Sequence, residues 1–199
     1  MIEMNAASLR FLLKAVLPAM STDMTRVGLT QVEFRAEEGW IVAIATDGHR
    51  LHRAKVRWAQ ITDGTIAPVG RFVVRGEHLT ALLKALPPTP KRGNPPPVTL
   101  APSGATWAGT SLAFRASDSP MPDTDRVIPA TREGDAAVKF AANPEYLTDA
   151  CEAARLLGRD VGVKIESGER PLDPICLRAT GYVGAESAEF LAVIMPMRV

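Results

Sequence analysis

Residues 41–55, IVAIATDGHRLHRAK, contain the strongest local structural signal in the chain. An apolar run ends at Asp47-Gly48, and apolar residues resume at Leu51 and Val56 among basic side chains. Asp-Gly between two such runs favours a two-residue hairpin turn, because that turn needs positive φ at both central positions. The segment therefore predicts a strand, a tight turn and a second strand. Taken alone, it indicates only the tip of a surface hairpin.

Three amphipathic helices are predicted elsewhere in the chain, with starts near Ala6, Gly76 and Pro144. Asn5 and Asn143 are favourable N-cap residues, and Pro87-Pro88 ends the second helix. Apolar residues fall at helical spacing in each segment. The predicted apolar stripes are Leu9, Leu12, Leu13, Val16, Leu17 and Met20, then Leu79, Leu82, Leu83 and Leu86, then Leu147, Ala150, Cys151 and Ala154.

Short strand-like segments surround these helices in a repeating order. Since the helix starts lie about 70 residues apart, the order indicates repeated supersecondary units, each βαβββ. Such units cover one sheet face with a helix. We therefore predict an α+β fold with helices on one side of antiparallel sheets. The predicted strands are residues 27–35, 41–46, 49–56, 71–74, 98–100, 106–108, 112–115, 137–141, 161–165, 175–179 and 189–195, and residues 60–68 are a predicted linker.

Composition limits the classes of function. The 199 residues are 46% hydrophobic, and 23 basic side chains face 22 acidic ones, so the chain has no global basic field. Cys151 and Cys176 lie far apart without metal-ligand neighbours, which favours buried thiols in a reducing cytoplasm over a disulfide or zinc. No charged-then-apolar leader opens the sequence, and its apolar runs are shorter than a membrane span. We expect a soluble cytoplasmic protein.

Three segments occur in order along the chain: TDGHRL at 46–51, MPD at 121–123 with RVIP at 126–129, and IMPMRV at 194–199. Together they resemble the signature stretches of the bacterial sliding clamp family, the DNA polymerase III beta subunit. By this resemblance, residues 1–130 correspond to the family's complete middle domain of two βαβββ units. Residues 136–199 correspond to the second unit of its third domain. The chain thus looks like a clamp reduced to three units, with residues 130–134 at the point of deletion.

In that family the signature stretches line a groove for a short, Gln-led docking peptide that contains Leu and Phe. Apolar and methionine side chains suit an aliphatic or aromatic anchor, while the arginines and histidine can bond its carbonyls or carboxylate. His52 and Arg53 extend the basic run, with no assigned role. Without the motif context, each residue would pass as core or solvated surface. The resemblance implies a groove of Leu29, Thr46, Gly48, His49, Arg50, Leu51, Pro122, Arg126, Val127, Val193, Ile194, Met195, Pro196, Met197 and Arg198.

The resemblance also implies that helix residues face encircled double-stranded DNA without sequence specificity. Asp149 and Glu152 on the third helix oppose this, because carboxylates repel phosphate. A helix face with two or three basic residues is otherwise typical of a solvated surface. The candidate DNA-facing residues are Arg10, Lys14, Lys84, Lys91 and Arg92.

A third unit without a pairing unit would expose a sheet edge and part of its core. We therefore expect residues 136–199 to pair with the same segment of a second chain about a twofold axis. Two chains would supply six units, half of a family ring, and four chains would close it.

The predicted function is non-catalytic tethering of DNA polymerase, clamp loader or repair proteins to DNA. The alternative is a non-encircling peptide-binding adaptor or competitor. Asp47 and His49 are neighbours in a tight turn and make no base–orienter pair, and no Ser- or Cys-centred nucleophile motif accompanies them. His49, His52 and His78 lack a carboxylate-supported ligand set, so we expect no metal and no cofactor.

Overall fold

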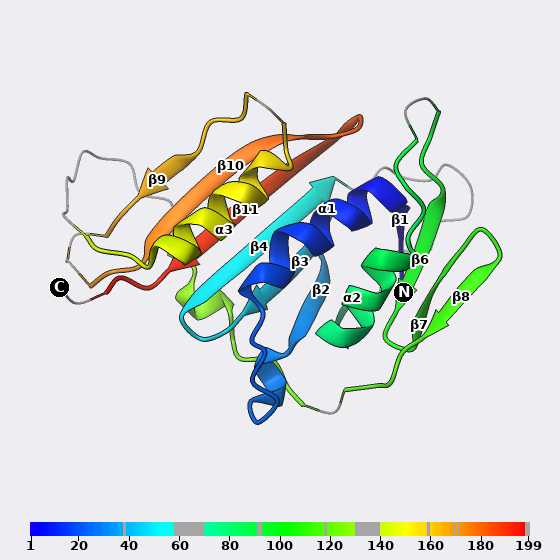
Figure 1. Ribbon diagram of the computed structural model, residues 1–199, viewed down its shortest axis with the longest axis horizontal. Coiled ribbons are helices and arrows are strands. Elements are labelled where there is room, and N and C mark those ends of the chain that lie inside the picture. Colours follow the sequence, from blue (N-terminus) through cyan, green and yellow to red (C-terminus); the bar gives the residue numbers. More distant parts are fainter. Residues whose placement is uncertain are drawn as a thin grey trace.

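Antiparallel sheets form one layer and helices the other in the computed structural model of the chain (Figure 1). The structure describes residues 1–37, 39–57, 70–90, 93–117, 119–129, 140–158, 160–168, 170 and 172–197. The helices are α1 (Ala6–Val16), α2 (Gly76–Ala85) and α3 (Pro144–Arg155), with 3₁₀ turns η1 (Leu17–Ala19), η2 (Val27–Leu29) and η3 (Asp125–Val127). The strands are β1 (Ile2–Asn5), β2 (Gln31–Glu37), β3 (Trp40–Thr46), β4 (Arg50–Arg57), β5 (Arg71–Arg75), β6 (Pro97–Ala101), β7 (Gly104–Trp107), β8 (Thr110–Ala113), β9 (Lys164–Glu166), β10 (Ile175–Val183) and β11 (Glu186–Ile194).

Several predictions fall on residues outside the described part. They are the linker at 60–68, the point of deletion at 130–134, residues 137–139 of a predicted strand, and Lys91, Arg92 and Arg198. No helix in the described part is both long and apolar enough to cross a bilayer.

The predicted helix starts are confirmed, and side chains cap two of them. Asn5 accepts a hydrogen bond from the Ser8 amide, and Asn143 accepts one from the Glu145 amide. The predicted face of α3 needs one correction: the helix buries Ala150, Ala153 and Ala154 but leaves Cys151 exposed. Strand β1, which the sequence analysis did not predict, precedes α1.

The first two units exchange their first strands. Strand β5 precedes α2 yet pairs with β2, in the sheet of the first unit. Strand β1 precedes α1 yet pairs with β6, in the sheet of the second unit. The described strands thus form a four-stranded sheet, β1-β6-β7-β8, and a seven-stranded sheet, β5-β2-β3-β4-β11-β10-β9. Each unit completes the sheet of the other.

The third unit extends the sheet of the first. Strand β11 pairs antiparallel with β4, from Ala188 opposite Val56 to Ile194 opposite Arg50. This corrects our expectation that the third unit pairs with nothing in its own chain. Strand β9 is one of four edge strands in the described sheets, together with β5, β1 and β8, and it is bonded only to β10. The division into domains at 1–130 and 136–199 stays a prediction.

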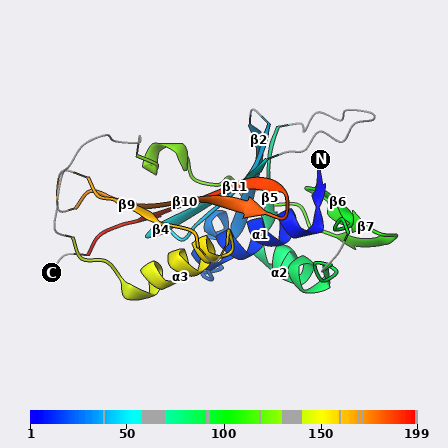
Figure 2. The same ribbon diagram turned by 90° about the horizontal axis from the view of Figure 1, so that it is seen from above.

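All three helices lie on one face of the sheets, as predicted (Figure 2). Helix α1 lies between α3 and α2 and packs against both, so almost its whole circumference is buried. A large apolar core fills the space between helices and strands, with fully buried Leu9, Leu12 and Leu79. A smaller apolar cluster lies on the opposite face of the seven-stranded sheet; it comprises Val42, Ile44, Leu51, Met121, Cys176, Leu191 and Val193.

The predicted hairpin turn is present, with a different centre. Thr46 pairs with Leu51, and the Asp47 amide donates to the Arg50 carbonyl at 3.4 Å, so Gly48 and His49 form the tip. Of these two tip residues, Gly48 has positive φ, +92°, and His49 does not. Asp47 stabilises the turn through its side chain, whose carboxylate accepts hydrogen bonds from the backbone amides of His49 at 2.8 Å and Arg50 at 2.9 Å.

Polar contacts fasten the third unit to α1 and to this turn. The Glu186 carboxylate, at the start of β11, accepts hydrogen bonds from the Asn5 amide group at 2.6 Å and from the Ser8 hydroxyl, at the N-terminus of α1. The negative charge is favourable there because the helix dipole is positive at that end. At the opposite end of the β4–β11 pair, Arg50 forms an ion pair with Asp149 of α3.

The β4–β11 pairing is the joint between the first and third units, and His52 lies at its centre. His52 is a core residue, which corrects the prediction that it extends a basic run on the surface. It is fully buried on β4, its Nδ1 lies 2.7 Å from the Ala15 carbonyl oxygen, and its ring packs edge-on against Phe190 of β11. Burial lowers the pKa of His52 to about 4, although the Ala15 carbonyl opposes the shift. The imidazole is therefore neutral in the folded protein near pH 7.

This pKa predicts loss of stability at mildly acidic pH. Between pH 6.5 and 4 the unfolded chain binds a proton at His52 that the folded chain does not, so stability falls as the pH falls. Between pH 7.5 and 5.5 we expect wild type to lose about 1.3 kcal/mol more unfolding free energy than His52→Gln. Urea denaturation at both pH values measures this difference. His49→Gln, at an exposed position, is the control and keeps the wild-type loss; equal losses in wild type and His52→Gln would contradict the prediction.

Candidate functional site

A pocket of about 260 Å³ opens where the β3–β4 turn, residues 122–127 and the end of β11 meet. Three segments that are distant in sequence thus form one small apolar site. Ten of the predicted groove residues line it: Leu29, Thr46, Gly48, His49, Arg50, Leu51, Pro122, Val127, Val193 and Met195.

The β4–β11 pairing positions the two longest walls of this pocket. Leu51 lies directly opposite Val193, and the Met195 amide donates to the His49 carbonyl at 3.0 Å. Both residues of the Leu51–Val193 pair belong to the apolar cluster on the face away from the helices. Val127 and Met195 remain 46% and 43% exposed, so they form an accessible apolar rim above a buried floor. Such a rim suits an aliphatic or aromatic anchor.

The remaining predicted residues lie elsewhere. Ile194 is fully buried in the core on the helix side, because successive strand residues point to opposite faces, so its predicted place in the groove is corrected. Met197 continues past the groove and bridges to Ala141, with Pro196 before it. Arg126 is exposed beside the pocket and forms an ion pair with Asp123 at 3.0 Å.

Arg50 lines the pocket but its guanidinium has structural partners. It bonds Asp47 at 3.1 Å and the Pro18 carbonyl at 2.5 Å, forms an ion pair with Asp149, and stacks over Tyr146 at 4.4 Å from the ring centroid. These contacts hold the turn against α3. The predicted role of its side chain as a donor to peptide is therefore corrected to one in positioning the turn.

Three lining residues were not predicted from the sequence: Arg26, Asp123 and Thr124. Arg26 lies over Gly48, and a Cβ at that glycine would come within 2.9 Å of its Nη2. Its Nη1 also donates to the Asp47 carbonyl at 3.4 Å. Arg26 lies in a polar loop without periodicity, so no sequence signal placed it beside the turn.

An ion-pair network under residues 119–128 supports the third wall. Arg35 donates to both oxygens of Asp125 at 2.8 Å and to Glu33 at 2.6 Å, and Thr124 accepts a further bond at 3.0 Å. Glu33 is fully buried and is also paired with Arg71. The network anchors η3, which carries Val127, to strand β2.

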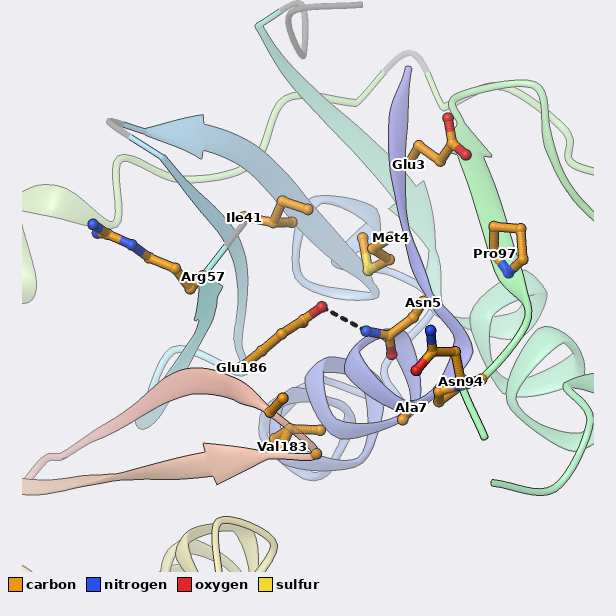
Figure 3. A pocket seen from close by; sticks show the side chains of 13 residues that line it. Glu3, Met4, Asn5, Ala7, Ile41, Arg57, Asn94, Pro97, Val183 and Glu186 are labelled. Carbon is orange, nitrogen blue, oxygen red and sulfur yellow. Dashed lines mark hydrogen bonds between the residues drawn. The ribbon is translucent and has the colours of Figure 1, made fainter. Parts of the chain in front are cut away.

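Two further pockets, each about 390 Å³, adjoin the joint between the units. One shares Val127 and Met195 with the groove and extends it toward Glu166, Asp173 and Cys176. The other lies at the far end of the β4–β11 pair, beside the N-terminus of α1, where Asn5 points to Glu186 (Figure 3).

Of the predicted DNA-facing residues, Lys14 and Lys84 are exposed on the helix layer. The Arg10 side chain, in contrast, is engaged within the helix layer. Its guanidinium donates to the carbonyls of Leu83, Leu86 and Pro87, at 3.4, 2.9 and 2.8 Å, and so caps the end of α2. Its assignment to DNA contact stays a prediction.

Asp47 serves the turn: its carboxylate accepts backbone amides, including that of His49. Within the described ranges, no group of three His, Cys, Asp or Glu side chains could hold a metal ion.

Comparison with known proteins supports the resemblance suggested by the three motifs. No protein-family model matches the chain. The beta sliding clamp of Bacillus subtilis is 27% identical over 154 residues, which are 76% of this chain and 38% of that protein. Among solved structures, the Pseudomonas aeruginosa DNA polymerase sliding clamp crystallised with a ligand has a TM-score of 0.70 at 18% identity, and covers 100% of this chain. The B. subtilis clamp structure has a TM-score of 0.58 at 21% identity, again over the whole chain.

These findings confirm the resemblance to bacterial sliding clamps and the clamp-like fold. The chain spans 38% of the length of its curated relative and 66% and 64% of the two solved chains.

The buried network predicts the effect of removing Arg35. Arg35→Met leaves the Glu33 carboxylate buried with one partner fewer, so we expect the unfolding free energy to fall by roughly 3 kcal/mol. Urea denaturation measures the loss. Adding Glu33→Gln removes the buried charge and recovers part of it. Arg126→Met, at an exposed ion pair, changes stability by less than about 0.5 kcal/mol. A wild-type value for Arg35→Met would show that the network contributes nothing.

Proposed function

We propose that the chain is a non-catalytic, sliding-clamp-like protein that binds the docking peptides of DNA polymerase, clamp loader or repair proteins and tethers those proteins to DNA. The observation that carries the proposal is the pocket itself. Three motif segments, separated by up to about 140 residues in sequence, converge on one apolar site of about 260 Å³.

The pocket suits a short peptide with an apolar anchor. Its floor is apolar, with Leu29, Leu51 and Val193, and its rim carries Val127 and Met195. Methionine adapts its shape to different side chains, which favours a site that accepts several partners. Arg26 and His49 lie at one end and can donate hydrogen bonds to peptide carbonyls.

The alternative is an adaptor that binds the same peptides without encircling DNA. Arg10 donates to carbonyls at the end of α2, which leaves fewer of its N–H groups for phosphate and gives this alternative specific support. Both functions require the pocket, so a peptide-binding assay tests them together. Whether the protein encircles DNA distinguishes the clamp from the adaptor.

The peptide test uses a fluorescent, Gln-led peptide that contains Leu and Phe. Val127→Asp places a charge on the exposed apolar rim, and Met195→Ala removes packing there, so we expect each to weaken binding by at least about tenfold in fluorescence anisotropy. Tyr182→Asp, at a 67% exposed position near the other end of the β10–β11 pair, is the control and keeps wild-type affinity. Binding that neither rim substitution changes would reject the groove.

The topological test uses nicked circular DNA and a clamp loader. An encircling clamp stays on the closed circle and is lost once the DNA is cut to a linear form, because only a free end lets a ring slide off. Gel filtration of labelled protein with the DNA measures the retained fraction. Equal retention on circular and linear DNA, or none on either while the peptide still binds, would favour the adaptor.

A further inference from the structure

Each of the first two units receives a strand from the other at the edge of its sheet. Among the described residues, the third unit receives no such strand. In the first two units, the strand that leads into each helix is inserted at the edge of the other unit's sheet: β5 beside β2, and β1 beside β6. Strand β9 occupies the place of β2 and β6 in the third unit, and its outer edge is open in the described part of the chain. An open edge presents unpaired backbone groups that favour pairing with another strand.

The position four residues before each helix start shows the same difference. This position is Ile2 before α1 and Phe72 before α2, and both pack into the core. Phe72 lies opposite Phe34 across the exchanged pair, and the two rings stack with centroids 5.5 Å apart. The matching residue before α3 is Phe140, and its side chain is 40% exposed. The third unit therefore presents an aromatic side chain where the other units bury an apolar one.

The position seven residues after each helix start gives a second, independent difference. Leu13 in α1 is fully buried, and Leu83 in α2 packs against the core where α1 and α2 meet. The matching residue in α3 is the exposed Cys151. One flank of α3 packs on α1, so the flank that carries Cys151 is where a second helix would lie.

The edge itself is apolar on the helix side. Ile165 in β9 lies opposite Leu177, which faces the helix-side core, so both side chains share that face. Ile165 is nevertheless 54% exposed, because no inserted strand or second helix covers it in the described structure. Phe140, Cys151 and Ile165 thus mark the three surfaces that a paired unit covers.

We infer that the third unit self-associates with the third unit of a second copy of this chain, by reciprocal exchange of residues 140–143 onto the β9 edge. The occupant is a second copy because each third unit offers both the donor segment and the acceptor edge, which makes the contact self-complementary about a twofold axis. Ala141 already bonds Met197 of its own chain at 2.8 Å. Alternate residues of a strand bond to opposite sides, so Phe140 and Ala142 keep their backbone groups for the partner's β9.

The experiment is sedimentation analysis of the full chain over a range of concentrations. Wild type is expected to reach twice the chain mass of 21.4 kDa. Phe140→Asp and Ile165→Asp each place a charge in the exchanged contact, so each is expected to weaken dimerisation by at least tenfold. Met24→Asp, at a position 63% exposed outside the third unit, is the matched control and stays dimeric. Circular dichroism and the peptide-binding assay establish that the monomeric variants remain folded.

Cross-linking gives an independent readout of the helix contact. A short bismaleimide is expected to join two wild-type chains through Cys151, and Cys151→Ser abolishes the product, since Cys176 is buried. A wild-type chain that stays monomeric at all concentrations would overturn the inference. So would a dimer that both Phe140→Asp and Ile165→Asp leave intact. Because the peptide pocket lies within one chain, loss of self-association leaves peptide binding in place, and the two proposals fail separately.

Discussion

Backbone pairing between β4 and β11 is the interaction on which the rest of the arrangement depends. It joins a unit from the end of the chain to the first unit and makes one seven-stranded sheet from the two. The groove lies at one end of this pair, where Leu51 meets Val193 and Met195 bonds His49. At the other end, Glu186 is bound to the N-terminus of α1. Shifting β11 by one residue along β4 would turn Val193 to the helix side of the sheet while Leu51 stays in place, so the site requires this particular alignment.

Arginines around the joint serve mainly to position other groups. Arg50 holds the β3–β4 turn to α3, Arg35 holds η3 over the sheet, and Arg10 caps α2. Each guanidinium can reach several carbonyl or carboxylate oxygens at once because its donors are arranged as a planar fork. The consequence is a groove whose walls are fixed by charged contacts, while its floor and its exposed rim stay apolar. A preorganised apolar site loses less conformational entropy when a peptide binds.

The exchange of first strands explains why the units come in pairs. A βαβββ unit that gives its first strand to a neighbour needs a strand in return to cover its own sheet edge. The first two units meet this need within the chain. The third unit covers one edge of its strands by pairing β11 with β4. Its other edge, at β9, and the outer flank of α3 stay open in the described structure. The self-association inferred above would complete it by the same exchange.

The sequence by itself determined the local elements and most of the groove's composition. Apolar periodicity and the caps at Asn5 and Asn143 placed the helices, because these signals are carried by neighbours in the chain. The family resemblance named ten lining residues, eight of them within the motif segments. Only the tertiary structure decided which arginines were already engaged, that Ile194 faces the core, and that Arg26 lies beside Gly48. It also decided that the third unit joins β4. The physical reason is that partner choice for a long side chain or a strand edge depends on groups brought close by folding, and spacing in the sequence carries no information about them.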